Sequence, residues 1–436
     1  MKTLKFVLIF NLILFLINGG ITKAQWVFQQ NPLGYGENAM LGPAQFVSLT
    51  EGWINGNGNT ILHTSNAGNL WSVVKVSSVD VLFSISDPAF NLCFVNPQTG
   101  WVLKTLGSGF GDAKGAVLFY TVDGGVSWKK SIISQESGEI GMQLQFLDSK
   151  IGWASVWNVK TQAGKFYKTN DGGISWTLIN NSIKPTDVVT CFHFENQTTG
   201  WLTEINDTPP SFSISKTTDG GVTWISQYME NNLNGVDTMT NSGAMQFVDE
   251  NHGWVVGPKS RILKTSNGGT GWTKITNAGI GTDAYLKCLF ALDANHVWIG
   301  VGIPDQHGNT QTNELIRTTD GGNSWSKESI NLTNSAFSIF FLDLNHGWLT
   351  ADLGVIAAFK GTTGMQTKEN SKIAVWTENG QIRVTNVIDC DLISVFDRTG
   401  KLIQQVKIQD NQAVIAGLPI GFYLIRAGKD LVKIVL

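Results

Sequence analysis

The stretch TTDGGVTW runs from Thr217 to Trp224 and returns almost unchanged as TTDGGNSW from Thr318 to Trp325. Relatives of this turn motif occur six times in the chain, and each ends in a tryptophan: Trp71, Trp128, Trp176, Trp224, Trp272 and Trp325. The third position holds an aspartate in four copies (Asp123, Asp171, Asp219 and Asp320) and an asparagine in two (Asn66 and Asn267). Successive copies lie 57, 48, 48, 48 and 53 residues apart, so the chain carries an internal repeat.

A second marker, Gly-Trp, alternates with the turn motif. Its tryptophans are Trp53, Trp101, Trp153, Trp201, Trp254 and Trp348, with Val297-Trp298 as a seventh, variant copy. Around each marker, short segments rich in Val, Ile and Thr alternate with polar turns and show no helical periodicity. Seven units of about four short strands are typical of a β-propeller, so we predict an all-β fold with seven blades over residues 25–361.

The composition of the turn motif indicates a structural role. An aspartate can accept hydrogen bonds from the backbone N–H groups of its own turn, and the paired glycines supply positive φ angles. The tryptophan is expected to begin the fourth strand of a blade and to pack against a neighbour. A phosphate-binding loop would need a following helix, which none of the six copies has.

The seventh repeat, from about Ser338, has no tryptophan at the turn-motif position. Trp26, at the start of the repeat region, can supply it. We therefore predict that the strand WVFQQ pairs with the strand near Val355–Phe359. This pairing closes the ring between the two ends of the array and removes two exposed sheet edges.

The N-terminus is typical of a secretory signal peptide. Lys2 and Lys5 precede an apolar run from Phe6 to Ile17, and a small-residue cleavage site follows Ala24. The run is too short to span a bilayer, so residues 1–24 are assigned to a signal peptide and no membrane span is expected after its removal. The net charge of −3 gives no footprint for nucleic acid. We expect a monomer.

After the repeats, residues 362–370 form a polar stretch that we interpret as a linker. Residues 371–436 alternate apolar residues with turns, for example around Asn379-Gly380, and predict a small Ig-like β-sandwich.

Two resemblances to known families rest on these segments. The unit GWVVGPKSRILKTSNGGTGW resembles the Asp-box (BNR-like) repeat, most closely that of photosystem II assembly-factor-like propellers. This resemblance implies the fold, whereas Asp-box propellers host several unrelated activities. The tail segments ISVFDRTGKLI, LPIGFYLIR and VKIVL resemble the type A sorting domain of type IX secretion substrates. That resemblance implies recognition by the secretion machinery and a secreted or surface-attached protein, although the family's final lysine is absent.

No cofactor or metal centre is predicted. The four cysteines Cys93, Cys191, Cys288 and Cys390 form no CxxC pair, and we expect free, buried thiols. The six histidines include no HxH or HExxH set, and nucleophile-elbow and dinucleotide fingerprints are absent.

The sequence leaves two functions open. A sialidase is excluded because its site needs three arginines and the propeller has two, Arg261 and Arg317. The leading prediction is non-catalytic binding of a glycan or protein by loops opposite the turn motifs. The long ones are expected at Gly107–Gly115, Asn158–Gly164, Asn206–Pro210 and Pro304–Gln311. The alternative is a polysaccharide-active hydrolase or lyase that uses acids in or beside these loops: Glu204, Asp207, Asp305 and Asp352.

Overall fold

The computed structural model describes most of the chain from Gln25 onward. Outside the described residues lie 1–24, 37–38, 78–91, 108–109, 180–187, 208–209, 232–242, 258, 305–309, 329, 331, 333–335, 362–373, 379–380, 386, 388–389, 397–401, 419–421, 429 and 436. The predicted signal peptide and linker are therefore not among the described residues. The described part is all-β, with short 3-10 turns and no α-helix among them.

Blade 5 shows how one repeat folds. Its strands are β18 (Ala244–Phe247), β19 (Gly253–Gly257), β20 (Arg261–Thr265) and β21 (Thr273–Lys274), which pair in that order into one antiparallel sheet. Polar turns reverse the chain between β18 and β19 and between β20 and β21. All of β19 is buried because neighbouring blades cover both faces of the sheet.

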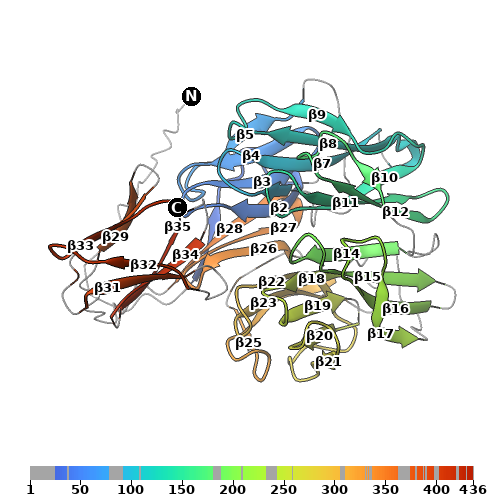
Figure 1. The fold of residues 1–436 in the computed structure, drawn as a ribbon. Helices are drawn as coiled ribbons and strands as arrows, with labels where there is room; N and C mark the ends of the chain where they lie inside the picture. The colour runs from blue at the N-terminus through green and yellow to red at the C-terminus, as the bar shows by residue number, and fades with distance from the viewer. Residues whose placement is uncertain are drawn as a thin grey trace, which may run out of the picture.

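Seven such sheets form the ring (Figure 1). The other blades are, in strand order: blade 1, β2 (Leu41–Phe46), β3 (Gly52–Gly56), β4 (Thr60–Thr64) and β5 (Ser72–Lys75); blade 2, β6 (Leu92–Phe94), β7 (Gly100–Leu106), β8 (Gly115–Thr121) and β9 (Lys129–Ile132); blade 3, β10 (Glu139–Phe146), β11 (Gly152–Asn158), β12 (Ala163–Thr169) and β13 (Thr177–Leu178); blade 4, β14 (Val188–Phe194), β15 (Gly200–Asp207), β16 (Pro210–Thr217) and β17 (Ile225–Asn231); blade 6, β22 (Tyr285–Ala291), β23 (Val297–Pro304), β24 (Thr310–Thr318) and β25 (Ser326–Lys327); and blade 7, β26 (Ala336–Asp343), β27 (His346–Ala351), β28 (Val355–Lys360) and β1 (Gln25–Gln29). The first strands of neighbouring blades contact one another around the ring, so these strands are innermost.

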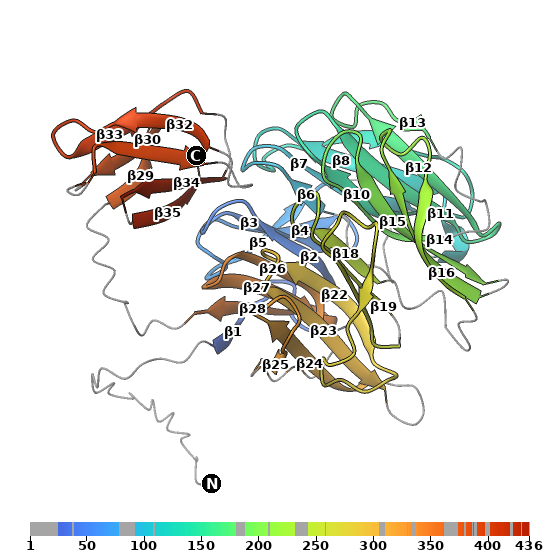
Figure 2. The ribbon, with the colours of Figure 1, turned by 60° about the horizontal axis from the view of Figure 1, so that its bottom comes forward.

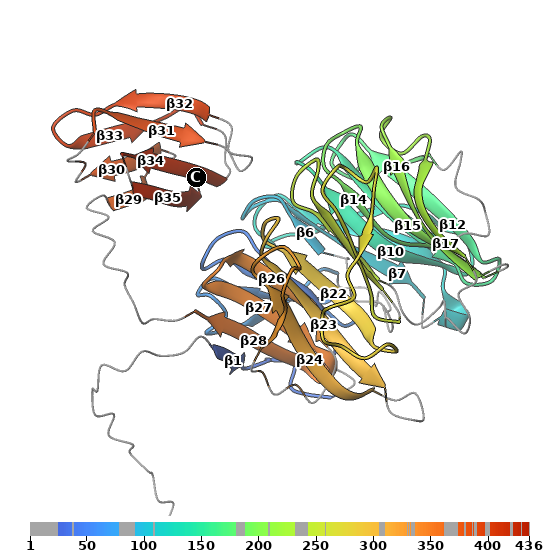
Figure 3. The same cartoon turned by 90° about the horizontal axis from the view of Figure 1, so that it is seen from below.

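The N-terminal strand closes the ring as predicted. β1 pairs antiparallel with β28 as the outermost strand of blade 7, with Trp26 opposite Phe359. Figure 2 and Figure 3 show β1, from the start of the repeat array, lying beside β28, from its end. Blade 7 thus takes strands from both ends of the repeat array, which links the two ends by a full ladder of hydrogen bonds.

Stacked aromatic rings join successive blades. The Gly-Trp tryptophan of one blade lies parallel to the phenylalanine of the next, as Trp201 does on Phe247 at 3.6 Å between ring centroids. The same phenylalanine meets the turn-motif tryptophan of its own blade edge-on, at 6.0 Å for Phe247 and Trp272. Ala291 has no ring, and there Trp254 packs edge-on to Trp325 at 6.1 Å. These buried aromatic residues account for the two markers found in the sequence.

The tail is a small β-sandwich, as predicted. One sheet contains β29 (Ala374–Glu378), β30 (Gln381–Thr385) and β33 (Gln412–Ile415). The other has the order β32-β31-β34-β35, formed by Leu402–Lys407, Leu392–Phe396, Phe422–Ala427 and Asp430–Val435. Ile382, Ile393 and Ile425 meet in a core of its own.

Some sequence predictions need correction. Three of the four expected long loops begin later than predicted, because Asn158, Asn206 and Pro304 still lie at the ends of β11, β15 and β23. The turn-motif tryptophan precedes the fourth strand instead of starting it, as Trp224 does before β17. All four cysteines are free, although only Cys191 and Cys288 are fully buried.

Candidate binding face

The turn-motif carboxylate is fully used inside its own turn. In blade 4, Asp219 Oδ1 accepts the Thr223 N–H at 2.9 Å, and Asp219 Oδ2 accepts the Thr223 hydroxyl at 2.6 Å. Thr217 Oγ1 donates to Asp219 Oδ1 at 2.8 Å and accepts the Gly221 N–H at 2.9 Å. Both glycines have positive φ, 79° and 101° for Gly220 and Gly221, which explains why glycine stands there.

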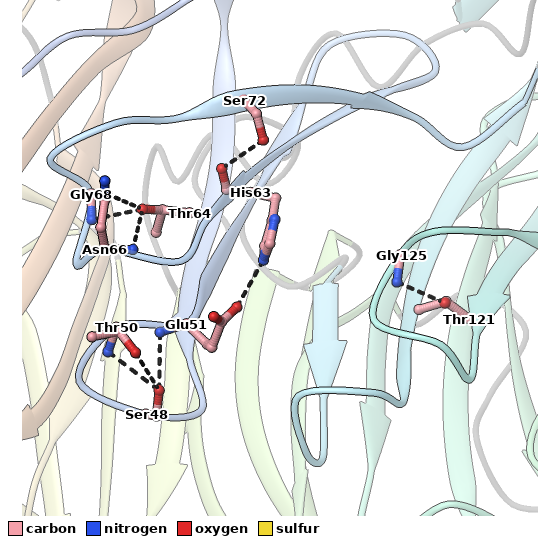
Figure 4. Close-up of polar contacts among 10 residues, drawn as sticks. All are labelled: Ser48, Thr50, Glu51, His63, Thr64, Asn66, Gly68, Ser72, Thr121 and Gly125. Atoms are coloured by element: carbon pink, nitrogen blue, oxygen red, sulfur yellow. Dashed lines mark hydrogen bonds and ion pairs between the residues drawn. The ribbon is translucent and has the colours of Figure 1, made fainter.

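The other copies repeat this geometry. Figure 4 shows blade 1, where Thr64 occupies the same central position and Asn66 replaces the aspartate. In blade 2, Ser127 donates to both oxygens of Asp123, and these bonds hold the pKa of that carboxyl at about 2. For Asp219, desolvation acts to raise the pKa, but the bonds from Thr223 and Thr217 outweigh it and hold the pKa at about 2. These acids therefore stay ionised and hydrogen-bonded, which is a structural role.

The turn also fixes the junction between blades. Trp153 Nε1 donates to the Gly220 carbonyl of the next blade at 3.0 Å, and Trp201 Nε1 donates to Gly268 at 3.1 Å. Lys216 Nζ reaches the same Gly268 carbonyl at 2.9 Å while lying 5.0 Å from the Trp201 ring centroid. The motif thus supplies carbonyl acceptors to its neighbour, which explains why the chain needs a copy in nearly every blade.

Because adjacent strands run antiparallel, each blade has two different ends. We call the end with the turn motifs and the first-to-second-strand turns the turn face. The opposite end, with the second-to-third-strand hairpins and the connections to the next blade, is the rim face.

The rim face differs in height from blade to blade. In blades 4, 5 and 6 the second strand begins at the equivalent Gly-Trp or Val-Trp position, yet β19 has 5 residues where β15 and β23 have 8. Three residues of strand correspond to about 10 Å, so blades 4 and 6 rise above blade 5 on this face.

Charged side chains are buried toward the rim face. Lys104, in β7, is only 2% exposed and donates to Asn55 Oδ1 at 2.6 Å and to the Gly56 carbonyl at 2.8 Å. Burial lowers the pKa of the Lys104 amine to about 7, because neither contact supplies a negative charge.

Two further buried charges have acidic or basic partners. Arg261, the first residue of β20, donates from Nε to Glu230 Oε2 at 3.0 Å. Its Cζ atom lies 4.3 Å from the centroid of the Phe212 ring. Glu139, the first residue of β10, lies with Oε1 2.7 Å from Lys165 Nζ. Equivalent positions of other blades hold other residues, such as Glu204 in place of Lys104 and Lys165 in place of Arg261, so each makes its part of the rim face different.

The structure describes the backbone at three of the four predicted catalytic acids. Glu204 lies within β15, not in a loop, and its Oε2 accepts the hydroxyls of Ser213 and Ser215 at 3.2 and 3.3 Å. Asp207 ends β15, and Asp352 begins the 3-10 turn Asp352–Gly354 in blade 7. Asp305 lies outside the described residues.

A glutamine side chain makes a repeated contact between blades that the sequence analysis missed. Gln145 Nε2 donates to the Phe194 carbonyl of the next blade and Oε1 accepts the Phe194 N–H, both at 2.8 Å. Gln45 and Gln246 hold the following blade in the same way. The Gln-Phe pair recurs three times in the sequence, so this signal was present.

Three histidines also occupy one repeated position. His252, His296 and His346 each place Nδ1 within 3.0 Å of the aspartate three residues earlier, in first-to-second-strand turns of blades 5 to 7. They hold turns on the turn face. Among the residues that the structure describes, no group of three or more His, Cys, Asp or Glu side chains could hold a metal ion.

Comparison with known proteins agrees with this architecture. The family described as photosynthesis system II assembly factor YCF48 matches residues 232–360. A structure of YCF48 bound to a D1 peptide has a TM-score of 0.55 and 16% identity, covering 80% of this chain and 99% of that one. The GH74 enzyme of Niastella koreensis has a TM-score of 0.53 and 13% identity, covering 93% of this chain and 73% of that one. At such identities the likeness shows the propeller fold alone.

A third structure of similar fold is YCF48 from Cyanidioschyzon merolae, with a TM-score of 0.53 and 17% identity, covering 77% of this chain and 99% of that one. No curated protein matches the sequence. Within the described part of the chain, no helix has the length and apolar character needed to cross a membrane.

Proposed function

We propose that this protein is an exported binding propeller without catalytic activity, which holds a protein or glycan ligand at its rim face. The observation that carries the proposal is the contrast between the two ends of the blades. At the turn face, the repeats use equivalent side chains for equivalent internal hydrogen bonds. At the rim face, strand lengths differ, and the buried charges Lys104, Glu139 and Arg261 lie in three different blades with different partners. A surface that differs at each blade can be specific for one ligand.

Of the two ligand classes, a protein segment is the one that we favour. A YCF48 structure of similar fold holds a D1 peptide, so a propeller of this kind can bind a peptide. The low identity means that neither the peptide's sequence nor its position carries over to this chain.

Export rests on the two ends of the sequence. The basic and apolar N-terminus supports a signal peptide, and the separate core of the tail sandwich supports an independent sorting domain. In this proposal, secretion machinery recognises the tail and delivers the propeller to the outside of the cell, either free or attached to the surface.

The competing function is cleavage of a polysaccharide by a hydrolase or lyase activity, because a GH74 enzyme shares the fold. It would require two of the acids Glu204, Asp207, Asp305 and Asp352 to converge at one bond. The serine contacts of Glu204 favour a role inside blade 4 instead.

The test is an array of polysaccharides and a display library of random 12-residue peptides, both presented to the protein purified from its host. Retained ligands are then analysed by mass spectrometry for cleavage. The proposal predicts retention of a peptide or a glycan in intact form. Cleaved glycan products would overturn it in favour of the enzyme, and retention of neither class would overturn binding.

A further inference from the structure

The outermost strand of each blade has an edge with no partner inside its sheet, and most of these strands are short or carry lysine. β13, β21 and β25 have 2 residues each, and β5 and β9 have 4. Lysines stand in four of these strands: Lys75 in β5, Lys129 and Lys130 in β9, Lys274 in β21 and Lys327 in β25. Short length and lysine both discourage an edge from pairing with another chain.

β17 departs from this pattern. It has 7 residues, ISQYMEN, with neither lysine nor proline. Its inner edge pairs with β16 from Ile225 opposite Lys216 to Asn231 opposite Ser211. For its outer edge, the described residues include no backbone partner. Ile225 and Met229 are 65% and 58% exposed, so the strand also presents apolar side chains to solvent.

The one charged residue of β17 is already neutralised. Glu230 lies 3.0 Å from Arg261 Nε and 3.3 Å from Lys274 Nζ, both of them in blade 5. The carboxylate is therefore turned toward the neighbouring blade and does not guard the edge. A bulge at Gln227, between the pairs of Ser226 and Tyr228, leaves Tyr228–Asn231 as a regular four-residue segment.

β1 is the other long outer strand and also lacks lysine. It differs from β17 because its apolar residues are used in closing the ring: Trp26 is buried against Phe341 and Phe359. Gln29 is used as well, since its amide bonds Ala67 and Trp71 of blade 1. β17 has no comparable structural task beyond its pairing with β16 and the contacts of Glu230.

We propose that β17 is a docking edge for an extended peptide segment of a partner protein, which adds a strand along Tyr228–Asn231. The chemistry of the edge selects the ligand class, because alternating backbone N–H and C=O groups match another peptide backbone and not a sugar ring. Side chains of the added strand would cover Met229 on one face and Tyr228 on the other, since successive residues alternate. Tyr228–Asn231 is the rim-side end of β17 but lies on the outer edge of blade 4, so this inference adds a contact beyond the proposed rim face. Its ligand is an extended peptide with alternating apolar residues.

The test compares Met229→Lys with Leu178→Lys. Both replace an exposed apolar residue of an outer strand by lysine, but Leu178 is in the two-residue β13. The probe is the library of random 12-residue peptides, panned on the full chain. We expect selected peptides with apolar residues at alternate positions, at least tenfold weaker binding to Met229→Lys, and a change within twofold for Leu178→Lys. Amide hydrogen exchange should slow at Tyr228–Asn231 when the peptide is bound.

Other outcomes separate this inference from the proposed function. Peptides that bind Met229→Lys unchanged and protect other residues would overturn the β17 edge and leave a binding propeller. Retention of glycans alone would do the same. A chain that is dimeric by itself and monomeric as Met229→Lys would also overturn it, because the occupant would then be a second copy. Glycan cleavage without retention would instead sink the proposed function.

Discussion

Trp26 meets Phe341 edge-on, with 5.8 Å between ring centroids and 83° between ring planes, although 315 positions separate them in the sequence. Phe247 and Trp272 of blade 5 have the same relation, at 6.0 Å and 89°. Trp26 therefore takes the place of the missing seventh turn-motif tryptophan. Trp26, from the start of the repeat array, thus closes the ring by filling the packing position for which the last repeat has no tryptophan.

Trp26→Ala should destabilise the propeller by about 3–5 kcal/mol, since it removes a buried indole at the closure. Phe28→Ala is the control, because Phe28 lies in the same strand but is 52% exposed, and it should change stability by less than about 0.5 kcal/mol. Denaturant unfolding of both variants checks this. Equal effects for the two would contradict the closing role of Trp26.

Asp219→Ala should lower the free energy of unfolding by about 1–2 kcal/mol, as expected when a side chain that accepts capping hydrogen bonds is lost. Asp219→Asn should cost less, because Asn267 at the same position of blade 5 accepts the equivalent backbone bond at 2.9 Å. Ligand binding should survive both changes, since the turn lies on the face away from the rim. Loss of binding at an unchanged melting temperature would contradict the structural role.

The turn acids also predict a dependence on pH. The carboxyl pKa of Asp123, Asp219 and Asp320 is held at about 2, below the ordinary value of 3.8. A lowered acid pKa stabilises the folded state above the unfolded value, and this stabilisation is lost as pH falls from about 4 to 2. The triple variant Asp123→Asn, Asp219→Asn and Asp320→Asn should therefore show a flatter decline of melting temperature over that range. A decline as steep as in the parent would show that other groups dominate.

The change in the free energy of unfolding caused by Lys104→Met should be more favourable at pH 6 than at pH 10. The amine pKa falls from 10.5 in the unfolded chain to about 7 in the fold, so the folded state disfavours the proton. The resulting penalty is absent above pH 10.5, grows as pH falls toward 7 and then stays constant. The comparison between the two pH values isolates this penalty, because the loss of the bonds to Asn55 and Gly56 is the same at both. Lys114→Met, at an exposed lysine, should show no such difference between the two pH values.

Deleting Ser371–Leu436 should leave a folded propeller that accumulates inside the cell envelope. The tail has its own core, and β1 closes the ring without it, so stability should fall only slightly. Thermal unfolding and fractionation of the culture test the two halves separately. A truncated protein found outside the cell would contradict the sorting role, and an unfolded one would contradict the domain boundary.

The repeat predicted the ring because its markers are packing residues. Each Gly-Trp and each turn motif has one place in a blade, so their spacing gave the blade number and the closing role of Trp26. The rim face could not be predicted in the same way. Asn206 and Pro304 were expected to begin long loops, yet pairing across each hairpin extends the strands through them. The buried Lys104 has no periodic signal, because its partners Asn55 and Gly56 belong to another blade.

The most direct test of non-catalytic binding uses a variant that lacks all four candidate acids. It carries Glu204→Gln, Asp207→Asn, Asp305→Asn and Asp352→Asn, and it is compared with the parent on the same polysaccharide and peptide panel, with product analysis by mass spectrometry. We predict that both proteins retain the same ligand and that neither releases a cleaved product. A glycan product formed by the parent and absent with the variant would contradict it.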